Sequence, residues 1–142
     1  MTTTVPLAME VRLDLPFDEA LERVTQALKE QGFGVLTRID VKDTLKKKLD
    51  VDFRDYAILG ACNPGLANRA LSARPEVGLL LPCNVTVEAA DDGGVLVRIA
   101  DPDVMMSVGG FEGDEVVSSV AAEARALLAK VAGSLTATES TD

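Results

Sequence analysis

The tetrapeptide Asp91-Asp92-Gly93-Gly94 constrains the fold more than any other segment of this chain. It separates two apolar stretches, residues 78–89 and 95–100, which have the length and the β-branched content typical of strands. Asp-Gly turns join neighbouring antiparallel strands, because glycine readily adopts the positive φ angles of tight hairpins. We therefore expect an antiparallel hairpin here, which argues against an all-parallel, doubly wound sheet.

Hydrophobic periodicity predicts the other elements. Strict alternation over residues 9–15 indicates a half-buried strand, and apolar spacings of three and four after Pro16 indicate an amphipathic helix that Gly32 ends in a left-handed conformation. Further strands are expected at residues 33–41 and 53–62, and further helices at residues 41–49, from Asn63-Pro64 to Arg74, and from Asp114 to Gly133. Asp101-Pro102 is expected to start a loop that carries Met105 and Met106.

These elements follow the order β-α-β-(α)-β-α-β-β-α. The order predicts an α+β fold, with a mixed or antiparallel sheet and helices on one face. We expect one domain over residues 9–133, preceded by an N-terminal extension of residues 1–8 and followed by a disordered polar tail of residues 134–142.

The net charge of the chain excludes some classes of binding partner. The 23 acidic and 14 basic residues give a net charge of −9, which repels phosphate backbones, so we expect no nucleic-acid partner. The lysines at 42 and 46–48 are flanked by aspartates and are interpreted as a solvated helix face. No secretory signal is visible, and no apolar run approaches the roughly 20 residues of a membrane span. We therefore expect a cytoplasmic protein, with no membrane segment, whose two cysteines stay reduced.

Absent residue types exclude several kinds of chemistry. The chain has no histidine, which removes Ser-His and Cys-His nucleophile pairs and histidine-ligated metal sites. It also lacks GxGxxG and Walker-type glycine loops, the two usual nucleotide cradles.

Two Cys-Asn pairs remain as the most informative feature. Cys62 directly precedes an expected helix start, where backbone N–H groups and the helix dipole favour a thiolate. It is either a redox thiol or anion-binding turn, or a small buried residue that closes a strand. Cys83 follows Pro82, which cannot donate to a ladder, so this strand is expected at a sheet edge or at a bulge. Cys83 in turn is either aimed toward a site or buried structurally.

The two thiols also have a joint interpretation. If they meet in the fold, they could bind a soft metal such as Cu(I) or form a reversible disulfide, and a dimer could gather four thiolates around zinc. Against this, the spacing of 21 residues is not a recognised metal signature, and there is no CxxC motif. Cys62 and Cys83 are therefore only weak metal candidates.

The runs Tyr-Ala-Ile-Leu-Gly-Ala-Cys-Asn-Pro at 56–64 and Leu-Leu-Pro-Cys-Asn-Val at 80–85 resemble the DUF302 family of small bacterial and archaeal domains. The segment from Phe17 through Gly-Phe-Gly-Val-Leu-Thr at 32–37 also matches, as does residues 41–49, so the resemblance covers roughly residues 11–132. It implies a TATA-binding-protein-like α+β fold, with a curved antiparallel sheet packed on helices, and a homodimer. It does not imply DNA binding.

The family's function is unassigned, so the resemblance supplies candidate positions without roles. Those positions are Cys62, Asn63, Pro64, Pro82, Cys83 and Asn84. Our first hypothesis is a non-enzymatic homodimeric domain that binds a small ligand or a protein partner in a groove between sheet and helix. The alternatives are a thiol-dependent redox or soft-metal-handling protein that uses Cys62 and Cys83, and a purely structural interaction module. No cofactor and no catalytic residue follow from the sequence.

Overall fold

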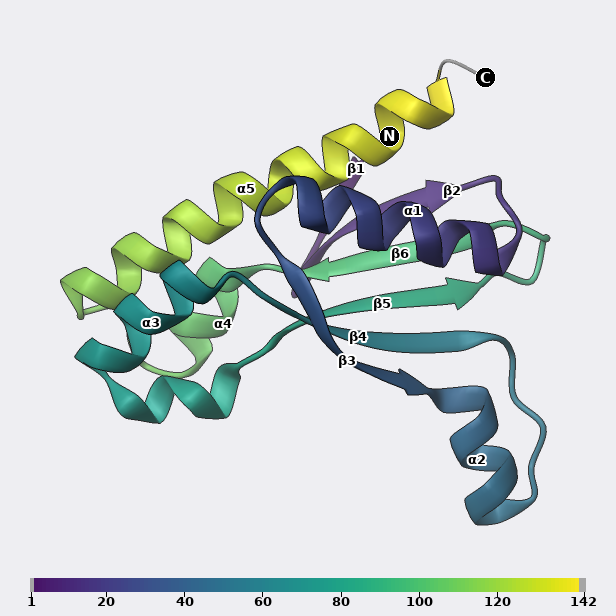
Figure 1. Cartoon of the computed structure of the whole chain (residues 1–142), viewed down its shortest axis with the longest axis horizontal. Coiled ribbons are helices and arrows are strands. Elements are labelled where there is room, and N and C mark those ends of the chain that lie inside the picture. Colours follow the sequence, from purple (N-terminus) through teal and green to yellow (C-terminus); the bar gives the residue numbers. More distant parts are fainter. Residues whose placement is uncertain (1, 141–142) are drawn as a thin grey trace.

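A computed structural model describes residues 2–140 and shows one six-stranded antiparallel sheet in the order β1-β2-β6-β5-β4-β3 (Figure 1). The α+β class with an antiparallel sheet is confirmed. The strands are β1 (Thr2–Val5), β2 (Ala8–Leu13), β3 (Gly34–Asp40), β4 (Tyr56–Cys62), β5 (Cys83–Ala89) and β6 (Val95–Ala100). The helices are α1 (Phe17–Glu30), α2 (Val41–Leu49), α3 (Pro64–Ala73), the 3-10 helix η1 (Pro75–Leu80), α4 (Pro102–Val108) and α5 (Glu115–Ser140).

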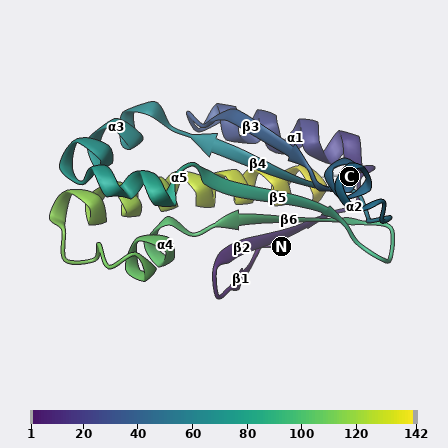
Figure 2. The same ribbon diagram turned by 90° about the horizontal axis from the view of Figure 1, so that it is seen from below.

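Helices α1 and α5 pack on one face of the sheet. In Figure 2 the strands lie in front of these helices, and no helix crosses the face turned to the viewer. Alternation along the strands sends valine, isoleucine and leucine to the helix side, where Val11, Val85 and Val97 are fully buried. They form one core with Val24 and Leu28 of α1 and with the inner stripe of α5.

The opposite face of the sheet is polar along β2, β6 and β5. The Arg98 guanidinium spans three strands there: its Nε donates to Glu10 Oε2 at 2.8 Å and its Nη1 to Glu88 Oε1 at 2.6 Å. These acidic side chains hold the pKa of the guanidinium above its usual value, the hydrogen bond to Glu88 being the largest cause. The residues between the buried valines are only partly buried, and the charged ones pair with one another, although Thr86 Oγ1 is buried without a hydrogen-bond partner among the described residues.

Several local predictions are confirmed. The β5–β6 hairpin turns through Asp91–Gly94, with Gly93 at φ 95°. Gly32 follows α1 at φ 84°, where the Phe33 N–H bonds to the Leu28 carbonyl. Asn63 caps α3, and Pro64 occupies its first turn.

The strand expected over residues 78–89 is wrong in its first half. Pro75–Leu80 form η1, and β5 begins only at Cys83, after Pro82. Pro82 has no backbone N–H to donate to a neighbouring strand. The strand therefore begins at the next residue that has a backbone N–H. Pro82 therefore marks neither an edge strand nor a bulge: β5 pairs on both sides, and the register shift lies in β3 between Val35 and Thr37.

The loop expected after β6 is also wrong, because residues 102–108 form α4. The Asp101 side chain accepts hydrogen bonds from the N–H groups of Asp103 and Val104, which caps this helix. Asp101-Pro102 starts α4 in the same way as Asn63-Pro64 starts α3. This pattern in the sequence could have predicted the helix.

The ends of the chain differ from the expected boundaries. Thr2–Val5 were placed in an extension, but they form β1 and pair antiparallel with β2. Gly133 does not end the last helix, because Leu135 continues the buried stripe of α5 and the helix runs to Ser140. The last two residues of the expected tail, 141 and 142, lie outside the described residues.

Candidate functional site

The two Cys-Asn segments meet where β4 ends and β5 begins. Strand pairing sets Gly60 opposite Asn84 and Ala61 opposite Cys83, although 21 residues separate the two cysteines in the chain. After Cys62 the chain enters α3, which lies beside α5 at this end of the sheet (Figure 1). The register thus brings five of the six candidate side chains to the ends of two adjacent strands, and Pro64 follows at the start of α3.

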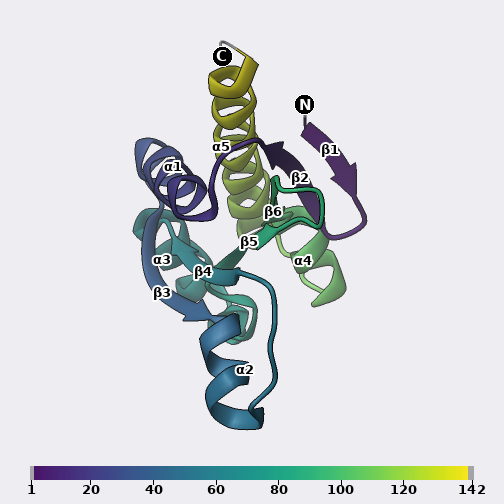
Figure 3. The same cartoon turned by 90° about the vertical axis from the view of Figure 1, so that its right-hand side faces the viewer.

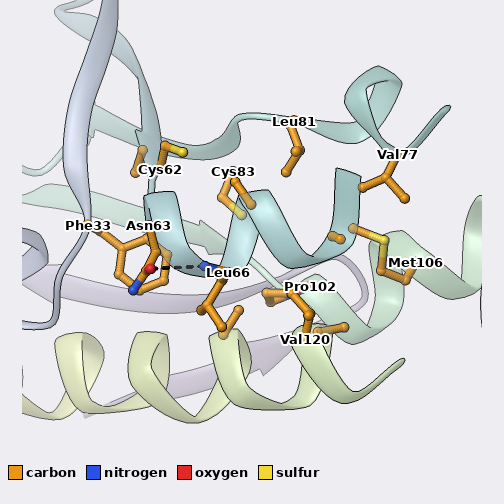
Figure 4. A pocket seen from close by; sticks show the side chains of 15 residues that line it. Phe33, Cys62, Asn63, Leu66, Val77, Leu81, Cys83, Pro102, Met106 and Val120 are labelled. Carbon is orange, nitrogen blue, oxygen red and sulfur yellow. Dashed lines mark hydrogen bonds between the residues drawn. The ribbon is translucent and has the colours of Figure 1, made fainter. Parts of the chain in front are cut away.

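Asn63 fixes the direction in which the chain leaves the sheet. Its Oδ1 accepts a hydrogen bond from the Leu66 N–H at 3.2 Å, the dashed line in Figure 4. The other end of its amide packs on Gly32, where an added Cβ would lie only 3.1 Å from Asn63 Nδ2. Asn63 therefore ties the end of α1 to the start of α3, a structural role that satisfies its carbonyl oxygen.

A first pocket lies between the strand ends and helices α3, α4 and α5. Its volume is about 40 Å³, and its walls include Cys62, Asn63, Cys83 and Met106. The other walls are apolar, from Phe33, Leu66, Val77 and Val120 among others (Figure 4). This space holds a few atoms, whereas ligand pockets of drug size measure about 300–1,000 Å³.

A second pocket opens on the other side of the same wall. Its volume is about 170 Å³, and Pro82, Cys83 and Asn84 line it together with Met105 and exposed Leu79. The wall shared by the two pockets consists of Leu81, Cys83, Pro102 and Met106. Five candidate residues therefore line one or both pockets, whereas Pro64 lines neither of these two.

The cysteines are free, half-buried and electrostatically coupled. Burial of the Cys83 thiol, reinforced by the charge of nearby Cys62, raises the pKa of Cys83 from 9.0 to about 11. Cys83 is therefore protonated at neutral pH and is a weak nucleophile. In Figure 4 the two cysteines lie at one end of the pocket and Met106 lies toward the other.

Metal binding has few ligands available here. Among residues 2–140, no group of three or more His, Cys, Asp or Glu side chains is placed to hold a metal ion. Two thiols on one pocket wall remain, a donor set suited to a soft monovalent ion such as Cu(I) rather than to a hard cation.

Gly60 has a steric role that follows from this register. A Cβ at Gly60 would lie 2.7 Å from Pro82 Cγ and would also collide with Thr37 Oγ1. The glycine thus lets Pro82 pack flat on β4 and brings Cys83 into register with Ala61. The sequence showed only a strand ending in small residues and not the close approach that requires one of them.

Asp101 holds the far wall of the pockets in place and was not among the candidates. It is 6% exposed, its Oδ1 caps α4, and its Oδ2 accepts a hydrogen bond from Arg125 Nε of α5 at 3.0 Å. Because Pro102 and Met106 belong to α4, this pair positions both side chains against the pocket. Asp101 is a positioning residue that acts through α4.

Comparisons with known proteins identify the family to which the chain is similar. Residues 9–135 match the Domain of unknown function DUF302. The crystal structure of an uncharacterized conserved protein DUF302 from Bacillus stearothermophilus is 28% identical, with a TM-score of 0.81, over 91% of this chain and 98% of that chain. No curated protein matches the chain.

The structure also bears on membrane insertion. Within residues 2–140, no helix combines the length and the apolar character needed to cross a membrane.

The family match covers the sheet from Met9 of β2 onward and the helices down to Leu135 of α5. The chain therefore belongs to the DUF302 family.

Proposed function

We propose that this protein is a non-enzymatic, homodimeric, cytoplasmic domain that binds a small neutral ligand, or an apolar side chain of a protein partner, at the two pockets beside β4 and β5. The observation that carries the proposal is the shared wall of Leu81, Cys83, Pro102 and Met106, which divides two adjoining pockets at the paired Cys-Asn segments. The homodimer is the assembly that the family resemblance implies.

The chemistry of the walls supports an uncharged ligand. No aspartate, glutamate, lysine or arginine lines either of these two pockets. An anionic or cationic ligand would lose its hydration there without gaining a partner charge. The net charge of −9 further disfavours nucleic acid and other polyanions.

The same walls give little support to catalysis. General acid–base chemistry needs a titratable group poised near the working pH, whereas the Cys83 thiol has its pKa raised to about 11. Asn63 already uses its carbonyl oxygen to cap α3. A binding role asks only for shape and apolar surface, which both pockets supply.

The test is a thermal-shift screen with small neutral apolar compounds, because a ligand that binds only the native state raises Tm. Ala67 lines the first pocket, so Ala67→Leu should fill it and abolish the shift. Ala122→Leu makes the same change on the exposed face of α5 and should keep the shift. If the Tm shift survives in Ala67→Leu, or no compound shifts Tm in the wild type, the first pocket is not the binding site.

A double Cys62→Ser, Cys83→Ser variant separates binding from thiol chemistry. We expect it to retain the ligand-induced rise in Tm, since shape and apolar walls carry the binding. Loss of the shift in a variant that still folds would favour the second candidate function.

That second candidate is soft-metal handling or redox chemistry by Cys62 and Cys83. It is favoured by one observation: both thiols line the first pocket, and the charge of one raises the pKa of the other. A bound cation would relieve this repulsion and release protons as it binds. Native mass spectrometry with Cu(I) under reducing conditions tests the metal-handling half: one retained ion, lost in the double serine variant, would support metal handling, and no retained ion would exclude metal handling.

A further inference from the structure

The segment between β3 and β4 projects from the body of the molecule (Figures 1 and 3). We define the arm as residues 41–55, which comprise α2 and the loop that leads to β4. None of the nine residues of α2 is buried. A helix this short is marginal in water by itself, because most helical stability in proteins comes from packing. The arm therefore lacks the packing that stabilises the other helices.

Exposed apolar side chains concentrate on and beside the arm. Of the ten large hydrophobic side chains exposed among the described residues, five fall within residues 36–53. They are Leu36, Ile39, Leu49, Val51 and Phe53. Single exposed hydrophobic residues are ordinary, but a group of this kind is typical of an interaction surface.

Helix α2 carries a charge opposite to that of the chain, although the loop residues Asp50, Asp52, Arg54 and Asp55 reduce the net charge of the whole arm to +1. Helix α2 has four lysines and one aspartate, a net charge of +3, in a chain of net charge −9. Leu45 and Leu49 are four residues apart on one side of α2, and Lys42 and Lys48 flank Leu45 at three residues on either side. Lys47 points to the opposite side of the helix. The arm thus presents an apolar stripe bordered by lysines.

A complementary surface exists on the same chain. An open groove of about 620 Å³ runs between α1 and β3, with an apolar floor of Leu21, Val35 and Leu59. Asp18 and Glu22 of α1 border it, and Arg38 of β3, which forms an ion pair with Asp40, also lines it. Helix α1 carries four acidic and two basic residues, a net charge of −2. The groove therefore offers an apolar floor, and on its α1 side an acidic rim, to a helix with an apolar stripe and basic borders.

We propose that α2 of a second copy of this chain docks in the α1–β3 groove, and that each copy docks its arm on the other. The inference rests on the homodimer of the proposed function and identifies the surface through which the two copies associate. Arm and groove both adjoin the edge strand β3, so a two-fold axis near β3 generates two identical contacts. Two chains of net charge −9 repel each other in most orientations, and this one sets a basic helix on an acidic rim.

The first experiment measures the dimer dissociation constant by sedimentation equilibrium for the wild type and for Leu49→Asp. Leu49 is 65% exposed in one chain, so the fold tolerates the change while the docked stripe does not. We expect the constant to rise at least about tenfold. Val108→Asp, at a residue 72% exposed on α4, is the matched control and should leave it unchanged.

A charge exchange identifies the receiving surface. Glu22→Lys and Lys48→Glu should each weaken the dimer several-fold, and the double variant should recover most of the loss, because the two charges face each other again. Neither Lys47 nor Lys48 forms an ion pair within residues 2–140, so both substitutions act on free charges. Lys47→Glu changes charge equally on the far side of α2 and should have little effect.

The outcomes separate this inference from the proposed function. A dimer unaffected by Leu49→Asp and by both charge reversals would place the interface elsewhere and overturn the inference while leaving the dimer intact. A wild-type monomer would overturn the dimer as well, but not the pocket, which the thermal-shift screen tests independently. If that monomer instead binds polyaspartate through Lys48, the arm serves an acidic partner of another kind, and self-association is wrong.

Discussion

Helices α3 and α2 have nearly the same length and both follow a strand directly, but they differ in how they are held. Helix α3 has an asparagine cap, buries Leu66 and Ala70, and packs on α5. Helix α2 has no side-chain cap bond and buries no residue. The first belongs to the core and shapes a pocket, whereas the second depends on a surface outside its own chain. Substitutions around α3 should therefore change folding stability, and those on α2 should change association.

The largest expected effect is at Asp101, which fixes the pocket end by joining α4 to α5. Asp101→Ala removes a helix cap and leaves Arg125 without its carboxylate, although Arg125 is partly exposed to water. We expect a loss of about 3 kcal/mol in the free energy of unfolding. Urea unfolding measures it, with the exposed neighbour Asp103→Ala as control. A loss under about 1 kcal/mol would show that α4 is held by apolar packing alone.

Gly60→Ala probes the close approach of Pro82 to β4. The added methyl group would overlap Pro82 Cγ and Thr37 Oγ1, so one of the two segments must move. Overpacking of this kind costs about 1–3 kcal/mol. Gly34→Ala is the control at the exposed start of β3, where an added Cβ meets nothing within 4 Å. Equal stabilities for the two variants would mean that the Pro82 contact yields without cost.

This contact also shows where sequence reasoning reached its limit. Alternation and capping residues predicted β2, α1, α3 and the hairpin, because those signals are local. Whether Cys62 and Cys83 meet depends on the register of β4 with β5, across a helix and η1 whose packing no local pattern reports. The same non-locality kept Met106 out of the candidate set, since α4 reaches the pocket through its packing on α5 and the Asp101–Arg125 pair.

Two short elements were missed for a different reason. Thr2–Val5 form an edge strand with no apolar alternation of their own, and their pairing with β2 is a tertiary effect. Residues 102–108 begin with a proline and are followed by two glycines, a composition typical of a loop, and the Asp101 cap outweighs it. The DUF302 resemblance supplied the candidate positions, but Pro64 lines neither of the pockets beside β4 and β5.

The pH dependence of the free energy of unfolding shows how well water is excluded from the pockets around Cys83. The pKa of Cys83 is raised in the folded state, so the stability it contributes is fully present below about pH 9 and is lost as pH rises toward about 11. The loss amounts to about 3 kcal/mol at most. The difference in the free energy of unfolding between wild type and Cys83→Ala isolates the contribution of this thiol. A difference that stays constant from pH 8 to about pH 11 would mean that water reaches this thiol.

The smallest expected effect compares the two helices most directly, because the residue that precedes each helix is replaced by alanine. Asn63→Ala removes the bond from Oδ1 to the Leu66 N–H and should cost about 1 kcal/mol. Asp40→Ala, before α2, removes only an exposed pair with Arg38 and should cost under about 0.5 kcal/mol. Both values come from urea unfolding at a protein concentration where the chain is monomeric. Equal costs would mean that α2 is coupled to the core after all, and the arm would then need no partner to hold it.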